Sequence, residues 1–274
     1  MNRTIVAAAL AWSVLGAGPA LAQFTPEEIA ERPRWEAFLL TAEIADSEQI
    51  RGDLAVTSPW RLTLRAEGVV REALWKNPEG MMGGYLEGWR FEVAAYLLDK
   101  GLGLGMVPPT VERRFRGNRG SLQLWVADGI ALKTKLDRKI RTPILKIFDW
   151  NRATYLQRAW DNLIANVDRH TNQILVTPDF RMILIDHSRA FRSGRRYDRE
   201  LLYGERNAGG PMPMNELPRA FVERLRDLTF DGVKRIVGDY LRDGEIESVL
   251  TRRDLILEEV DRQVRKEGEA NVLY

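Results

Sequence analysis

The chain contains no cysteine and only two histidines among its 274 residues. The absence of cysteine excludes disulfide bonds, which a core of this size can do without. A net charge of +2, from 41 basic and 39 acidic residues, argues neither for nor against nucleic-acid binding, which needs clustered charge. The local basic runs at residues 113–119 and 192–199 are typical of solvated loops, so we expect no nucleic-acid partner. No apolar run reaches the ~20 residues that span a membrane. What remains is an ordinary globular composition, 45% hydrophobic and 29% charged, in one large domain or two lobes.

The first 22 residues are typical of a secretory signal peptide. Arg3 supplies the positive start, residues 5–15 are mostly apolar, and Ala20-Leu21-Ala22 has the small-x-small form that signal peptidases cut. We therefore expect cleavage after Ala22, no integral membrane segment in the remaining chain, and a periplasmic or secreted location. Because the chain has no cysteine, no lipid can be attached at this cleavage site.

Strand patterns dominate the first half of the chain. After a short helical stretch over residues 25–40, residues 61–65 alternate between polar and apolar side chains. The pair Glu67-Gly68 follows them and favours a tight turn, which predicts a hairpin within residues 50–76. A glycine- and methionine-rich loop is expected at residues 80–84.

A helix is predicted over residues 86–100 and is expected to end at Gly101. Two more strands are predicted at residues 111–114 and 121–126, and the chain from residue 128 onward is mainly helical in pattern. A strand-rich part followed by a helix-rich part predicts two lobes, comprising residues 23–126 and 127–274.

The most informative stretch follows the helix whose apolar face runs from Tyr155 to Ile164. Asp168 comes just after the predicted end of this helix. Two short apolar strands, residues 174–176 and 182–185, then lead directly into Asp186. A charged residue after a buried strand is costly unless it is paired, solvated or bound to metal. The hairpin can bring both carboxylates to one edge, where one orients a hydroxyl and the other holds a metal ion.

These motifs together resemble the catalytic core of the phosphatidylinositol 3- and 4-kinase-like superfamily. The likeness begins with residues 168–170 (DRH) and 183–187 (ILIDH). Upstream, residues 73–76 (ALWK) resemble the strand that carries the nucleotide-binding lysine. Residues 91–97 (FEVAAYL) resemble the helix that carries its glutamate partner.

The hinge expected between the two lobes is preceded by residues 107–110 (VPPT) and 121–126 (SLQLWV). These residues resemble the corresponding segment in an exported bacterial branch of the same superfamily. The resemblance spans most of residues 50–191. It implies an α+β, bilobal protein-kinase-like fold, with a small strand-rich N-lobe and a larger helical C-lobe.

The resemblance also implies a nucleotide site in the first lobe. Lys76 would offer a compact positive charge to phosphate oxygens and pair with Glu92, whereas a lone lysine at a strand end more often faces solvent. The backbone of Gln123, Leu124 and Trp125 would bind the adenine ring, although the same run also suits a core strand. Residues 56–59 stand where a phosphate-covering turn is expected, but they lack its glycine-rich signature.

In the second lobe the resemblance makes Asp168 the catalytic carboxylate and Asp186 the ligand of Mg²⁺ or Mn²⁺. Kinases commonly carry an asparagine five positions after the catalytic aspartate. Gln173 occupies that position here, and Asn172 stands one residue earlier. Either Gln173 is a metal ligand, or Asn172 takes that role after a local shift, or metal binding is weakened.

The function that these residues predict is ATP-dependent phosphoryl transfer to a hydroxyl of a protein or small molecule. Two alternatives stay open. The first is a catalytically silent nucleotide-binding module, which Gln173 and export favour. The second is a metal-dependent hydrolase built on the two histidines, His170 and His187, beside Asp168 and Asp186. The hydrolase leaves the upstream motifs unexplained.

Overall fold

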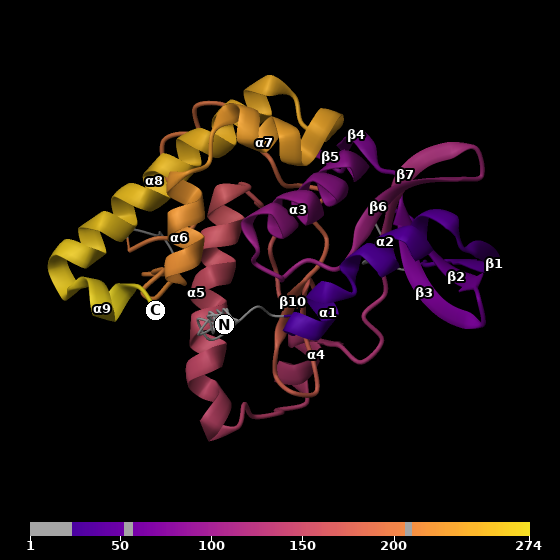
Figure 1. The fold of residues 1–274 in the computed structure, drawn as a ribbon, viewed down its shortest axis with the longest axis horizontal. Coiled ribbons are helices and arrows are strands. Elements are labelled where there is room, and N and C mark those ends of the chain that lie inside the picture. The colour runs from indigo at the N-terminus through magenta and orange to yellow at the C-terminus, as the bar shows by residue number, and fades with distance from the viewer. Residues whose placement is uncertain (1–23, 52–56, 206–209) are drawn as a thin grey trace, which may run out of the picture.

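The computed structural model describes residues 24–51, 57–205 and 210–274. The predicted signal peptide and residue 56 of the expected phosphate-covering turn lie outside these residues. Figure 1 shows an antiparallel sheet at one end of the molecule and long helices at the other. Among the described residues, no helix is long and apolar enough to cross a membrane.

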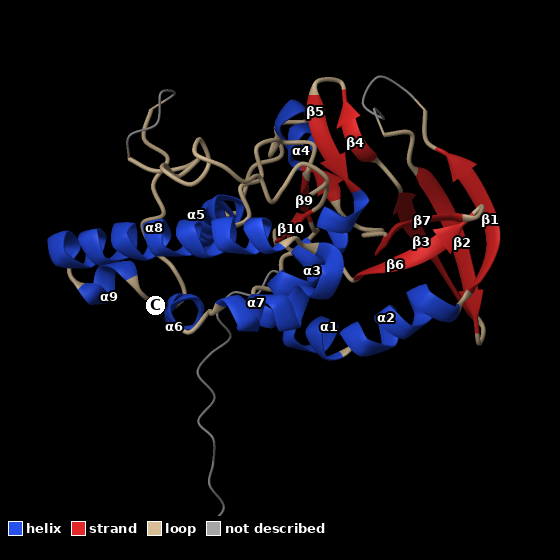
Figure 2. Ribbon diagram, turned by 90° about the horizontal axis from the view of Figure 1, so that it is seen from above, coloured by secondary structure: helices blue, strands red, loops and turns tan. Residues whose placement is uncertain are grey.

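The first part of the chain builds a five-stranded antiparallel sheet, preceded by two helices, α1 and α2. The strand order is β1-β2-β3-β7-β6. Figure 2 shows α2 running along one side of the sheet. The bounds are α1 Pro26–Ala30, α2 Arg32–Thr41, β1 Glu43–Gln49, β2 Trp60–Ala66, β3 Val69–Lys76, β6 Thr110–Phe115 and β7 Asn118–Leu124.

The predicted hairpin is confirmed as β2 and β3, which pair from Trp60 opposite Trp75 to Ala66 opposite Val69. Leu62 and Leu64, the apolar members of the alternating run, are fully buried. Glu67 and Gly68 both have positive φ, 48° and 75°, which suits the twist of a two-residue hairpin turn.

The predicted loop at residues 80–84 is wrong, because these residues belong to strand β4 and to the turn of a second, smaller hairpin. Strands β4 (Glu79–Met82) and β5 (Tyr85–Gly88) pair with each other, and Gly83 and Gly84 make the turn with positive φ. The next helix, α3, spans Trp89–Leu102 and ends at Gly103, which is left-handed. Gly101 therefore does not end the helix. It packs against Ile236, since a Cβ on Gly101 would lie 2.8 Å from that side chain.

The second part of the chain is mainly helical and includes a three-stranded sheet in the order β10-β9-β8. The predicted strands around residue 175 and before Asp186 are confirmed. The bounds are β8 Ile130–Ala131, α4 Leu132–Asp137, η1 Ile144–Lys146, α5 Ile147–Leu163, β9 Ile174–Val176, β10 Met182–Leu184, α6 Arg219–Arg226, α7 Phe230–Val237, η2 Gly238–Tyr240, α8 Asp243–Glu267 and α9 Glu269–Val272.

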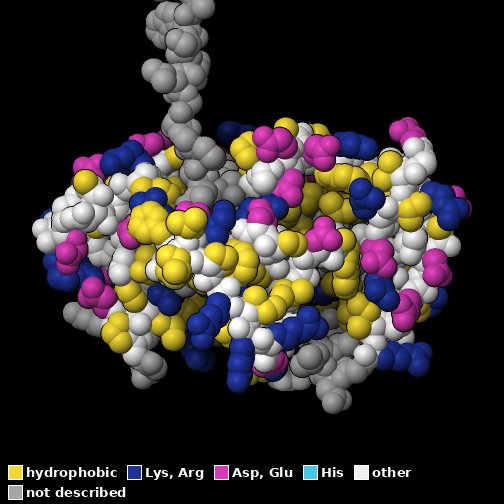
Figure 3. Space-filling view, turned by 90° about the horizontal axis from the view of Figure 1, so that it is seen from below, with side chains coloured by type: hydrophobic (Ala, Val, Ile, Leu, Met, Phe, Trp, Pro, Cys, Tyr) yellow, Lys and Arg dark blue, Asp and Glu magenta, His cyan; other side chains and the backbone are white. Residues whose placement is uncertain are grey.

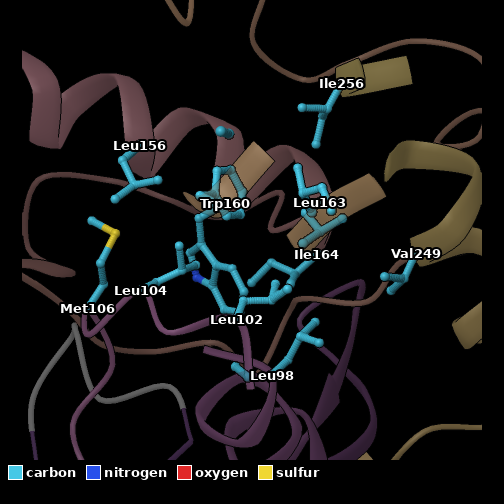
Figure 4. Close-up of a cluster of buried hydrophobic side chains, with 14 of the residues drawn as sticks. Leu98, Leu102, Leu104, Met106, Leu156, Trp160, Leu163, Ile164, Val249 and Ile256 are labelled. Carbon is cyan, nitrogen blue, oxygen red and sulfur yellow. The ribbon is translucent and has the colours of Figure 1, made fainter. Parts of the chain in front are cut away.

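Helix α3 contributes its buried side chains to the larger core, not to the sheet's own core. In Figure 4, Leu98 and Leu102 of α3 lie beside Trp160 and Leu163 of α5. The sheet closes a separate, smaller core around side chains such as Leu62, Leu64 and Trp75.

Polar contacts hold both ends of α3 to the C-terminal helices. At its start, Arg90 binds Glu245 of α8 at 2.6 Å and the carbonyl of Tyr240 at 2.7 Å. At its end, Arg224 of α6 donates to the carbonyl of Leu102 at 2.6 Å. The helix is therefore fixed to the helical part of the protein, although it precedes β6 and β7 in sequence, and the buried Arg32–Asp99 pair at 3.0 Å also fixes it to α2.

Candidate functional site

The site begins at the end of β3, where Lys76 points between two acids. Its Nζ lies 3.0 Å from Oε1 of Glu92 and 2.8 Å from Oδ1 of Asp186. The side chains of Lys76 and Glu92 are only 8% and 3% exposed. The interpretation of Lys76 as a solvent-facing lysine is therefore wrong, because the hairpin register turns it inward and two carboxylates satisfy its charge.

Burial and charge oppose one another in this ion-paired group. Burial alone would lower the pKa of Lys76, but the charges of Asp186 and Glu92 outweigh it and raise the pKa above its ordinary value. For Glu92, burial would raise the pKa, but the Lys76 charge prevails and the pKa falls well below its ordinary value. The backbone N–H of His187 also donates to Oε2 of Glu92 at 2.9 Å. Lys76 and Glu92 are therefore both held in their charged forms at neutral pH.

Asp186 follows the buried strand β10 and turns out into a cavity. Its φ of 61° is left-handed, a conformation that aspartate and asparagine tolerate better than most residues. Lys76 and the hydroxyl of Ser188 both bind Oδ1, at 2.8 and 3.2 Å. Oδ2 has no protein hydrogen-bond partner among the described residues, and the side chain is 36% exposed. Asp186 can therefore offer a carboxylate oxygen to a ligand.

Asp168 lies in the loop after α5 and has both of its oxygens engaged. Oδ1 accepts from Nη1 of Arg189 at 2.9 Å, and Oδ2 accepts from Nε2 of Gln173 at 3.1 Å. The oxygen of the Gln173 amide accepts from the backbone N–H of His170 at 3.4 Å. Gln173 thus orients Asp168 in this geometry, while Asn172 also lines the cavity.

A buried arginine fixes the loop that carries Asp168. Arg169 binds Asp161 of α5 through Nε at 3.0 Å, and both side chains are almost fully buried. Its Nη1 donates to the carbonyls of Gln173 at 3.0 Å and Ile185 at 2.6 Å. One side chain therefore connects the loop of Asp168 to Ile185, the residue before Asp186.

These acids meet at a cavity of about 300 Å³, near the lower end of the range for small-molecule sites. A larger hollow of about 670 Å³ lies beside α8 and α9, but none of the predicted site residues lines it. The smaller cavity is lined by Thr57, Glu87, Asp168, His170, Asn172, Gln173, Ile185, Asp186, Ser188 and Arg189.

Two residues of this cavity, Glu87 and Arg189, had no signal in the sequence. Nε of Arg189 lies 2.5 Å from Oε1 of Glu87, so Arg189 bridges Glu87 and Asp168. Glu87 is 2% exposed, and its Oε2 has no hydrogen-bond partner among the described residues. Neither residue stands out from the many other charged residues of the chain. Their contact joins segments that are far apart in sequence, so no local pattern indicates it.

The predicted adenine-binding run lies apart from the cavity of the two aspartates. The N–H of Leu124 donates to the carbonyl of Pro109 at 2.9 Å, and that of Trp125 to the carbonyl of Glu72 at 3.0 Å. The Gln123 amide binds Thr110 at 2.9 Å. Leu124 and Trp125 line a second cavity of about 220 Å³, so adenine binding by this run stays a prediction.

The two histidines do not share an environment. His170 lines the cavity, whereas His187 is fully buried, with its Nε2 3.0 Å from Nη2 of Arg169 and its ring against Trp160. Across the part of the chain that the structure describes, no group of three or more histidine, cysteine or acidic side chains is placed to hold a metal ion. The geometry therefore does not favour the hydrolase.

The lowered pKa of Glu92 makes the folding stability of the protein depend on pH in a way that can be tested. A depressed carboxyl pKa adds stability above its unfolded value of ~4.3, and this stability is lost as the pH falls through the folded value. We expect Glu92→Gln to lower the free energy of unfolding most at neutral pH. The difference in unfolding free energy between the variant and wild type should shrink as the pH falls below ~4.3. Urea denaturation of both proteins across this range measures it, and a gap that stays constant would show that the Glu92 charge contributes no stability.

Comparison with known proteins gives a fold but no sequence family. No protein-family model matches the chain, and no curated protein matches it in sequence. A solved structure of hydra Fam20 with sugar is similar, with a TM-score of 0.64 at 14% identity over 89% of this chain and 92% of that chain. With its small antiparallel sheet and its helical part, the chain has the mixed α/β, protein-kinase-like fold that its motifs predicted.

Proposed function

We propose that this protein transfers a phosphoryl group from ATP to a hydroxyl group. The observation that carries the proposal is the joint placement of four side chains in a protein-kinase-like fold. Lys76, Glu92 and Asp186 form one ion-paired group, and Asp168 lines the same 300 Å³ cavity as Asp186. Positioned charges of this kind supply most of the catalysis in phosphoryl transfer.

Each residue has a distinct role in the proposal. Lys76, which pairs with Glu92 and with the cavity-lining Asp186, binds phosphate oxygens. Asp168 orients the acceptor hydroxyl and takes its proton, and Gln173 and Arg189 fix the orientation of that carboxylate. Before a ligand binds, the guanidinium of Arg189 neutralises the carboxylate of Asp168.

The donor set suits a magnesium ion that is bound together with phosphate. Mg²⁺ favours oxygen ligands and usually takes one or two carboxylates plus substrate phosphates. Oδ2 of Asp186 is available, and the cavity also offers neutral oxygens from the amides of Asn172 and Gln173 and from the hydroxyl of Ser188. Bound there, the ion would neutralise charge on the transferring phosphate.

The acceptor class stays open between a protein hydroxyl and a small molecule. Hydra Fam20 was solved with sugar, so a sugar hydroxyl belongs among the acceptors to be tried. The proposed export of the chain would place the reaction outside the cytoplasm, so ATP would have to be supplied there.

ATP with Mg²⁺ should raise the melting temperature of the wild-type protein. A ligand at ~100 times its Kd stabilises the folded state by about 2.7 kcal/mol. Asp186→Asn keeps the shape and tolerates the left-handed backbone but removes the charged ligand, so the magnesium-dependent part of the shift should disappear. Differential scanning fluorimetry with ATP, Mg²⁺ or Zn²⁺ alone, and ATP with Mg²⁺, measures it.

The matched control is Asp261→Asn, an exposed carboxylate on α8 that lies away from the cavity. It should retain the full shift. Stabilisation by Zn²⁺ alone would instead support the hydrolase, and an unchanged shift in Asp186→Asn would remove Asp186 from the metal site.

A further inference from the structure

An exposed apolar surface spans the end of α4, the segment that follows it and the first turn of α5, and none of its residues lines the cavity of the proposed active site. Ile144 and Leu145 are 86% and 91% exposed, although large apolar side chains rarely gather on a surface without a partner. This surface, called here the apolar tip, consists of Leu136, Ile140, Ile144, Leu145, Ile147 and Phe148. These six are most of the large hydrophobic residues found exposed in the described chain.

The apolar tip is a projection, not a groove. In Figure 1, η1 and the first turn of α5 form the lower extremity of the molecule. Figure 3 looks at this side and shows hydrophobic side chains gathered there, with Lys and Arg side chains beside them. A convex apolar surface is poorly shaped to enclose a peptide or small ligand, but it can enter a soft, flat surface.

The charges around the apolar tip are mostly positive. The two acids in this segment are already paired, Asp137 with Lys133 at 2.7 Å and Asp149 with Lys146 at 4.0 Å. Three exposed cations, Arg138, Lys139 and Arg141, form no ion pair with any residue that the structure describes. The segment therefore offers unneutralised positive charge next to exposed apolar side chains.

We propose that the apolar tip and these three cations bind the surface of an anionic phospholipid membrane. Apolar side chains that enter the boundary of the acyl chains, next to cations that meet the headgroups, are the features of proteins that lie on membranes. A second copy of this chain fits less well. In a symmetric dimer the same surface meets itself, which would set the three cations against their counterparts.

The surface is independent of the proposed phosphoryl transfer. Most of it lies around the start of α5, and the loop of Asp168 follows the other end of this helix, whereas Leu136 lies on α4, whose Lys133 N–H donates to the carbonyl of Thr171 at 3.0 Å. The 17 residues of α5 span ~25 Å, so the membrane contact would leave the cavity open to its ligands.

Vesicle flotation of the full chain tests the proposal. Wild type should bind vesicles of phosphatidylcholine with phosphatidylglycerol, and bind vesicles of phosphatidylcholine alone much less. Binding should weaken from about 0.1 M to about 1 M salt, as the Debye length falls from ~10 to ~3 Å. All variants share one N-terminus, so any contribution from residues 1–22 is the same in each.

Ile144→Ser with Leu145→Ser should reduce binding about tenfold or more, because two exposed apolar side chains are lost. Replacing Arg138, Lys139 and Arg141 by alanine should reduce binding to anionic vesicles roughly 100-fold at low salt. Leu40→Ser, which removes a 53% exposed leucine on α2, is the control and should bind like wild type.

Equal flotation of wild type and the Ile144/Leu145 variant would overturn the proposal. The proposal would also be overturned if the wild type did not bind anionic vesicles but formed oligomers in light scattering, while the Ile144/Leu145 variant stayed monomeric. That result would assign the apolar tip to a second copy of the chain.

Discussion

Asp168→Asn should lower the rate of phosphoryl transfer by a factor of about 10² to 10⁴ while leaving ATP binding intact. The amide keeps the shape of the carboxylate and can still contact Arg189, but it cannot accept the proton of the acceptor hydroxyl. Because the side chain is 32% exposed and lies at the cavity wall, we expect little change in folding stability. Radiolabel transfer from ATP onto protein, sugar and envelope-extract acceptors measures the rate.

The matched control is Asp179→Asn, a carboxylate in the turn between β9 and β10 that binds Thr177 and Arg181. It should transfer phosphate like wild type. Full transfer by Asp168→Asn would mean that the catalytic loop is misassigned. A wild type that binds ATP but labels no acceptor would identify a catalytically silent protein.

Lys76→Met should abolish the ATP-dependent thermal shift and also destabilise the protein by about 3–5 kcal/mol, because it leaves the buried Glu92 carboxylate without its cation. An exposed lysine could be replaced with little loss of stability. The burial of Lys76 changes that expectation. Urea denaturation gives the stability, and thermal shift with ATP and Mg²⁺ gives the binding.

A double variant separates the two effects. Lys76→Met with Glu92→Gln removes both buried charges, so much of the lost stability should return. ATP binding should not return, because the lysine is still absent. If the double variant binds ATP as wild type does, neither residue belongs to the nucleotide site.

Local patterns in the sequence predicted the elements that depend on neighbouring residues. The alternation over residues 61–65 and the turn at Glu67-Gly68 gave the β2–β3 hairpin, because a strand with one buried face has a period of two. The apolar face of residues 155–164 gave α5, and the two short apolar runs gave β9 and β10. From these elements the approach of Asp168 and Asp186 followed.

Features that depend on distant contacts could not be predicted in this way. Gly101 looked like a helix end, but α3 continues to Leu102, and the lack of a side chain at Gly101 makes room for Ile236 of α7. The glycines of residues 80–84 marked a turn, while the pairing around it depends on two strands that lack a clear alternation. Arg189 reaches Glu87 across 102 positions of the chain, and nothing local to either residue indicates the other.

The attachment of α3 to the C-terminal helices has a mechanical consequence. Lys76 belongs to the sheet and its small core, whereas Glu92 moves with the larger core, to which Arg90 and Arg224 fasten its helix. The Lys76–Glu92 pair therefore joins the sheet to a helix that is anchored on both sides, since Asp99 of α3 also binds the buried Arg32 of α2 at 3.0 Å. The position of the lysine is thus set jointly by the strand that carries it and by both parts of the chain that hold α3.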